Sequence, residues 1–204
     1  MKWILLIGVS CLTCVRQPAL PSISKHNVTA VLNDSAWFAT GKAIRLFQQG
    51  DQPNSVQQFN LQIVTDLDFP GNNSASRSPA ITGCNGDCVP TQRLHLYNIP
   101  LKKGKYKLGR LDKRQTVESD KTNYVLLIDG SGVYKNYQLG HRAPNWIRIT
   151  NYNRSSNTID GQFRLNLDAN QPTPGTVRTA DRTAATARFR EGLFQVKLID
   201  VTLK

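Results

Sequence analysis

Residues 193–201 read LFQVKLIDV, and this stretch decides the fold class. Phe194, Val196 and Leu198 alternate with other residues, several of them polar, which is the period of a strand with one buried face. Alternation of this kind is typical of antiparallel sheets, because one face packs on a core while the other meets water. The stretch therefore predicts a strand of an antiparallel sheet.

The same alternation recurs along the chain from residue 26 onward. It marks the segments 28–32, 43–47, 59–64, 93–97, 146–149 and 163–167. Turn signals fall at 103–104, 129–130, 136–140, 160–161 and 172–175. This spacing predicts an all-β fold, an antiparallel β-sandwich or barrel of about 8–10 strands. The segment 182–188 has helix-forming residues, but we interpret it as a loop.

The composition is that of one soluble-type domain with an excess of positive charge. The chain has 204 residues, 39% of them hydrophobic, which lies above the range of disordered proteins. Lys and Arg number 26 against 14 Asp and Glu, so the net charge is +12. This composition excludes a transmembrane bundle, a coiled coil and an acidic tail, and it names no substrate.

The N-terminus is typical of an export signal. Residues 1–10 combine Lys2 with a short apolar run, far below the roughly 20 residues that span a bilayer. The segment 8–11, GVSC, resembles a bacterial lipobox with Cys11 as the acylated residue, although Gly8 stands where Leu is usual. We expect residues 1–10 to be a signal peptide and 11–25 a lipidated tether.

Other interpretations of the N-terminal cysteines stay open. The signal could be cleaved without lipidation, or Cys14 could serve as the acylated residue. Cys11 and Cys14 could also form a redox pair, but they lack the strand-then-helix context that lowers a thiol pKa.

Residues 26–204 are predicted to form a single β domain with a long loop at 66–90. Loops of this length inside a compact domain are often functional. Cys84 and Cys88 flank an Asn-Gly turn in this loop, so we expect a disulfide in an oxidising compartment. A metal site is the alternative, with Asp87 as the only further ligand nearby.

Four segments carry a resemblance to a known group of proteins. They are 28–37 with its Trp, 94–108 with its Gly-x-Tyr-x-Leu step, 147–163 with Ile-x-Gly-x-Phe, and 191–196 with Gly-x-Phe. Together they resemble small bacterial envelope lipoproteins of unknown function. The resemblance implies a β fold and an envelope location, and it brings no catalytic residues. The 66–90 loop and the positive charge depart from this group.

Residues that could support catalysis are sparse. The three histidines are scattered, and the chain has neither a nucleophile elbow nor a His-Glu-x-x-His zinc motif. His95 falls inside an alternating segment and is expected to be structural. Asp66 and Asp68 could serve a calcium or glycosidic site, but such pairs are common. We therefore predict no catalytic residues, no metal and no cofactor.

The basic residues carry the strongest functional signal. Seven of them crowd one segment, which we call the basic cluster: Lys102, Lys103, Lys105, Lys107, Arg110, Lys113 and Arg114. A second group contains Arg178, Arg182, Arg188 and Arg190. These residues could be a solvated face that maintains solubility, or a platform for polyanions such as acidic glycans or a membrane surface.

Two functions are therefore expected of an exported, membrane-anchored envelope protein. The first is a non-catalytic binding or structural module. The alternative is a carbohydrate-binding or adhesin-like module, with Tyr134 and Tyr137 as exposed aromatics that stack on sugar rings. Trp37 and Trp146 are expected to face the core. The expected partners are the membrane through the lipid anchor and a glycan, another polyanion or an envelope protein, and not nucleic acid.

Overall fold

The fold is seen in a computed structural model, which describes residues 26–51, 56–73, 75, 80–114, 117, 120–141, 144–170 and 183–203. The predicted signal peptide, Cys11, the 11–25 tether, Arg178 and Arg182 lie outside these residues. The elements in chain order are β1 (Val28–Leu32), β2 (Ser35–Gln48), β3 (Gln58–Thr65), β4 (Gln92–Pro100), β5 (Gly104–Lys107), α1 (Leu108–Asp112), β6 (Asn123–Ile128), β7 (Gly132–Leu139), β8 (Trp146–Asn153), β9 (Thr158–Ala169) and β10 (Thr186–Leu203).

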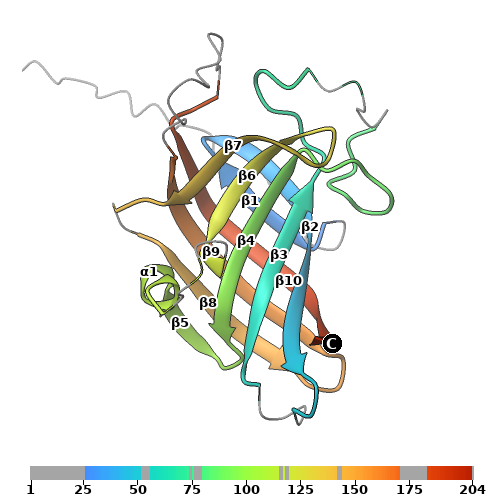
Figure 1. Cartoon of the computed structure of the whole chain (residues 1–204), viewed down its shortest axis with the longest axis vertical. Coiled ribbons are helices and arrows are strands. Elements are labelled where there is room, and N and C mark those ends of the chain that lie inside the picture. The colour runs from blue at the N-terminus through green and yellow to red at the C-terminus, as the bar shows by residue number, and fades with distance from the viewer. Residues whose placement is uncertain are drawn as a thin grey trace, which may run out of the picture.

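The strands form one 10-stranded sheet that closes on itself (Figure 1). Its order is β1-β10-β2-β3-β4-β6-β7-β9-β8-β5, and β10 also pairs with β9. A continuous ring of hydrogen-bonded strands therefore runs from β2 through β3, β4, β6, β7 and β9 to β10 and back to β2. The prediction of an all-β fold is confirmed.

One strand pair differs from the antiparallel prediction. β10 runs parallel to β2, with Leu198 beside Ala43 and Leu203 beside Gln48. The reason is β1, which lies between residues 35–39 of β2 and residues 189–194 of β10 and is antiparallel to both strands. Two strands that are each antiparallel to a third must run parallel to one another. β10 therefore meets β2 in parallel beyond Val28, where β1 begins.

The helical residues also differ from the prediction. The segment 182–188 contributes residues from 186 onward to β10, whereas a short helix, α1, forms within the predicted basic cluster. Leu108 and Leu111 are buried in the core, and their spacing of three places both on one helix face. The neighbouring residues in the sequence are mostly basic, so the apolar face of this short helix is not evident from the sequence.

Aromatic side chains fill the interior of the closed sheet. Trp37 is buried, as predicted, and Phe163 and Phe194 are buried too. The ring of Phe189 packs against Trp37 and Phe163, with centroid distances of 5.0 and 6.1 Å. Gly161 belongs to a predicted turn signal but lies inside β9, opposite a register shift in the neighbouring strand β8. A Cβ atom there would stand 2.2 Å from Cζ of Phe194, so the glycine makes room for that ring.

The strands β8 and β5 branch from the ring and enlarge its outer surface. The first half of β9 pairs with β8, whereas its last residues, 167–169, pair with β7. β5 adds to the free edge of β8, and α1 packs against β4 and β5. As a result β5, β8, β9 and β10 present one continuous outer face, which carries the candidate site (Figure 1).

Candidate anion-binding site

The predicted basic cluster lies on the surface. All seven of its residues are exposed: Lys102, Lys103, Lys105, Lys107, Arg110, Lys113 and Arg114. They belong to several elements. Lys105 and Lys107 lie on β5, Arg110 lies on α1, and the others lie before or after these elements.

Strand register extends this positive charge onto two further strands. Lys107 pairs with Trp146 on β8, and Trp146 pairs with Arg164 on β9. In a parallel row, Lys105 pairs with Arg148. Directly opposed residues of neighbouring strands have Cβ atoms about 4.5–5.5 Å apart on the same face. The side chains of these residues therefore lie side by side on the outer surface.

Two arginines of β10 complete what we call the basic face. Its members are Lys105, Lys107, Trp146, Arg148, Arg164, Arg188 and Arg190. Between Phe189 and Gly192 the register with β9 shifts, and Glu191 adopts a φ of 52°, so β10 bulges at Arg190 and Glu191. Alternation with buried Phe189 places Arg190 on the outside beside Arg188, and the bulge turns Glu191 toward solvent as well.

Trp146 was predicted to face the core, and this prediction is wrong. Ile147 and Ile149 of β8 are buried, so alternation places Trp146 and Arg148 on the outside. The ammonium nitrogen of Lys105 lies 4.2 Å from the centroid of the Trp146 ring, a cation–π contact. Trp146 is therefore a partly exposed aromatic group within the basic face.

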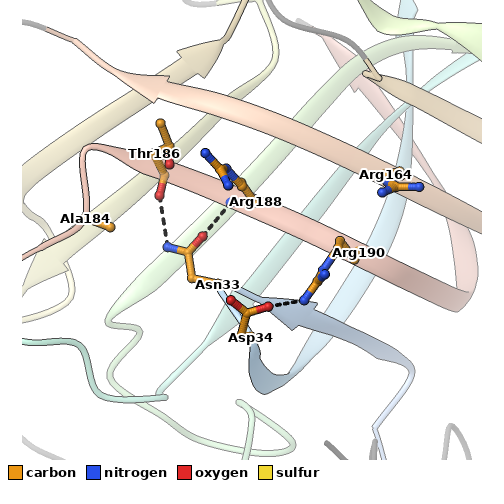
Figure 2. Close-up of a pocket in the computed structure, with 7 residues that line it drawn as sticks. All are labelled: Asn33, Asp34, Arg164, Ala184, Thr186, Arg188 and Arg190. Carbon is orange, nitrogen blue, oxygen red and sulfur yellow. Dashed lines mark hydrogen bonds and ion pairs between the residues drawn. The ribbon is translucent and has the colours of Figure 1, made fainter. Parts of the chain in front are cut away.

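The β10 end of the basic face contains a pocket of about 520 Å³ (Figure 2). Arg188 and Arg190 of β10 line one side, and Arg164 projects from the neighbouring strand β9. Asn33 and Asp34, at the tip of the β1–β2 hairpin, form the other side in Figure 2. The remaining lining residues are Ala184 and Thr186.

Asn33 fixes the hairpin tip to β10. Its side-chain Nδ2 donates a hydrogen bond of 2.9 Å to the carbonyl oxygen of Thr186, and its Oδ1 accepts one of 2.9 Å from the backbone N–H of Arg188. The backbone N–H of Asn33 donates to the carbonyl oxygen of Arg188 at 3.1 Å. Asn33 thus forms three hydrogen bonds that hold the backbone of β10 at Thr186 and Arg188.

The pocket carries an excess of positive charge. Arg190 forms an ion pair with Asp34 through Nη2 and Oδ1. Within the described ranges of the chain, no carboxylate lies at ion-pair distance from Arg164 or Arg188. Three guanidinium groups therefore face one carboxylate, and an anion would supply the missing negative charge.

Tyr137 does not offer a surface to sugar rings, which corrects the prediction. It is 2% exposed and packs in the core beside Tyr124, its partner on β6, with the ring centroids 5.4 Å apart. Its hydroxyl donates to the carbonyl oxygen of Ala184 at 2.9 Å. Tyr134 is half-buried, with its ring centroid 5.3 Å from that of Phe69. Trp37 is buried, as predicted.

The long loop between β3 and β4 is built around Asp66 and a disulfide. The sulfur atoms of Cys84 and Cys88 lie 1.98 Å apart, which agrees with the predicted disulfide. Asp66 accepts hydrogen bonds from the backbone N–H groups of Thr82 and Gly83, at 2.9 and 2.7 Å. Its carboxylate therefore secures the loop, and in the described part of the chain no cluster of His, Cys, Asp and Glu assembles a metal site.

His95 lies on the outward side of β4, away from the basic face. Its Nδ1 is 3.0 Å from the hydroxyl oxygen of Tyr97. Burial, with a smaller effect from the positive charge of Arg93, lowers the pKa of His95 to about 4. The imidazole is therefore neutral at pH 7, and it adds nothing to the charge of the protein.

Comparisons with protein-family models, with curated proteins and with solved structures found no match to this chain. Among the helical residues that the structure describes, no segment has the length and apolar character needed to cross a membrane.

Proposed function

We propose that this chain is a non-catalytic binding module of the bacterial cell envelope that recognises polyanionic ligands, such as acidic glycans. The observation that carries the proposal is the basic face, in which residues from four neighbouring strands place their charges together on one outer surface. Clustered positive charge raises the local concentration of anionic ligands and speeds their association. This favours a polyanion over a neutral sugar as the ligand.

The arrangement of charge supports a ligand over a purely solubilising surface. A surface that only maintains solubility mixes charges of both signs. β5 and β8 contain no acidic residue, whereas β9 and β10 carry Asp160, Asp168, Glu191 and Asp200. Arg190 forms an ion pair with Asp34, and both side chains are exposed. The cations of β5 and β8, which are Lys105, Lys107 and Arg148, therefore have no acidic residue on their own strands and can bind anions.

Heparin-affinity chromatography tests the proposal. A face variant combines Arg148→Gln and Arg164→Gln, and a control variant removes the same charge at two exposed positions outside the basic face through Lys42→Gln and Arg154→Gln. We expect the face variant to elute at clearly lower salt than the wild type, with the control close to the wild type. Equal shifts in both variants would show that net charge alone governs retention, and would contradict the proposal.

We further propose that Cys11 carries a lipid anchor and that residues 11–25 tether the domain to the envelope. The GVSC sequence supports this assignment. Cys11→Ser should move the protein from the membrane fraction to the soluble fraction, with Cys14→Ser as the matched control. Retention of the Cys11→Ser protein in the membrane fraction would contradict the anchor.

A further inference from the structure

We infer that the pocket formed by Arg164, Arg188 and Arg190 binds a phosphomonoester group, carried by a sugar or by a lipid headgroup. This inference rests on the proposed function, because the pocket lies at the β10 end of the basic face. It goes further by naming the anionic group and the side chains that recognise it. Three properties of the pocket support it: spacing, charge and rigidity.

The spacing of the arginines suits a single anionic group. Arg188 pairs with Asn166 of β9, and Arg164 lies two residues before Asn166 on the same face. With strands about 4.8 Å apart and a rise of about 3.3 Å per residue, the Cα atoms of Arg164 and Arg188 are about 8 Å apart. Arginine side chains are long enough to bring both guanidinium groups to one tetrahedral anion between them.

The charge of the pocket matches a dianion. Three guanidinium groups and the carboxylate of Asp34 leave two positive charges without a carboxylate partner in the described part of the chain. A phosphomonoester carries about −1.5 to −2 charges at pH 7 and has three acceptor oxygens. A sulfate ester or a carboxylate carries one negative charge, and would leave one guanidinium uncompensated.

The rigidity of the pocket favours geometric recognition. Asn33 holds the backbone at Arg188, and Asp34 holds the guanidinium of Arg190. The ion pair orients Arg190, whereas Arg164 and Arg188 have no carboxylate partner in the described part of the chain. Each guanidinium presents a planar fork that binds two oxygens of a phosphate at once. This arrangement selects a tetrahedral oxyanion over a diffuse negative surface.

Titration calorimetry of the full chain with three sugars tests the inference. Glucose 6-phosphate, glucose 6-sulfate and glucuronate share a pyranose ring, but they differ in the charge and shape of the anionic group. We expect glucose 6-phosphate to bind with a Kd of about 1 mM or tighter, and the other two about tenfold more weakly. Equal affinity for all three sugars, or no binding of glucose 6-phosphate, would overturn the inference unless the protein binds phosphatidic acid vesicles in preference to phosphatidylglycerol vesicles.

Vesicles distinguish the two sources of the group. Phosphatidic acid ends in a phosphomonoester, whereas phosphatidylglycerol carries a phosphodiester with a single charge. Co-sedimentation of a Cys11→Ser protein with phosphatidic acid vesicles, in preference to phosphatidylglycerol vesicles, identifies a lipid source. Binding of glucose 6-phosphate without such a preference identifies a sugar source. The absence of both overturns the inference.

Variants of Arg188 separate the pocket from the rest of the face. Arg188→Lys keeps the charge but loses the planar fork, so we expect the Kd for glucose 6-phosphate to rise about tenfold while heparin retention stays near the wild type. Arg154→Gln removes a charge from the exposed β8–β9 turn and should leave the Kd unchanged. An unchanged Kd in Arg188→Lys would contradict recognition by the arginine fork.

The two proposals fail in different ways. If the wild type binds heparin but neither glucose 6-phosphate nor phosphatidic acid, the pocket inference is wrong and the polyanion function stands. If it binds glucose 6-phosphate with dependence on Arg188 but is not retained by heparin, the pocket stands and the extended face is not a polyanion site. Thermal unfolding of each variant confirms that a lost signal is not lost folding.

Discussion

Replacement of Asn33 tests how the fold prepares the arginine pocket. Asn33 lies at the tip of the β1–β2 hairpin with a φ of 46°, in the left-handed region. Asn33→Gly preserves access to this conformation but removes the two side-chain hydrogen bonds, to Thr186 and from Arg188. Asn33→Ala removes the same bonds and also places a Cβ atom in a conformation that disfavours it.

The expected magnitudes follow from these contacts. A hydrogen bond contributes about 0.5–1.5 kcal/mol net, and both bonds are exposed, so Asn33→Gly should lower the free energy of unfolding by about 1–2 kcal/mol. The left-handed backbone adds about 1 kcal/mol for alanine, which brings the loss in Asn33→Ala to about 2–3 kcal/mol. Both variants should also bind glucose 6-phosphate more weakly, because the backbone at Arg188 is no longer held.

Urea denaturation with the disulfide intact measures both losses, and titration calorimetry measures the binding. The ranking of wild type, glycine variant and alanine variant is the critical result. If Asn33→Ala matches the wild type within about 0.5 kcal/mol, the hairpin tip is not held as described. If stability falls but the affinity for glucose 6-phosphate does not, Asn33 supports the fold without organising the pocket.

Three further predictions concern the core and the outward side of β4. Gln92→Leu should lower the free energy of unfolding by about 3 kcal/mol or more. The side-chain oxygen of Gln92 accepts hydrogen bonds from Trp37 Nε1 at 2.8 Å and from the Tyr124 hydroxyl at 2.6 Å, and both donors are buried. A loss below about 1 kcal/mol in urea denaturation would show that these donors find other partners. Gly161→Ala should lower the stability by about 2 kcal/mol or more, because the added Cβ atom would stand 2.2 Å from Phe194. Gly109→Ala in α1, where nothing lies within 4 Å of the added atom, should be neutral or stabilising. Equal effects of the two variants on the melting temperature would refute the steric argument. The pKa of His95 is lowered to about 4 in the folded state, so the unfolded state binds more protons between pH 6.5 and 4. As the pH falls through this range, the stability of the wild type relative to His95→Gln should decrease by up to about 3 kcal/mol. An NMR titration that gives a pKa near 6.5 for His95 would contradict this.

The strands were predictable because their signal is local. In β9, the residues Ile159, Phe163, Leu165 and Leu167 are buried and alternate with exposed or half-buried neighbours. Any chain with this period must bury one face, whatever its partners are. The parallel contact of β10 with β2 was not predictable, because it depends on how β1 joins two strands that are far apart in the sequence.

The candidate site was predictable only in part, because some of its residues are far apart in the sequence. Lys105 and Lys107 stand out because they are close together in the sequence, but Arg148 and Arg164 join them only through strand register. The outward direction of Trp146 was available in the sequence, since the isoleucines at 147 and 149 mark the buried face of the segment. The burial of Tyr137 was not predictable, because burial along β7 does not alternate regularly and the contact of Tyr137 with Tyr124 depends on the pairing of β6 with β7.

The salt dependence of heparin binding tests the basic face most directly. Titration of a heparin-derived oligosaccharide at several salt concentrations reports how many counterions are released, and so how many cations contact the ligand. We expect a shallower slope of log K against log salt for Arg148→Gln/Arg164→Gln than for Lys42→Gln/Arg154→Gln, which carries the same net charge. The same slope for both double variants would contradict it, because binding would then depend on total charge and not on the face formed by β5, β8, β9 and β10.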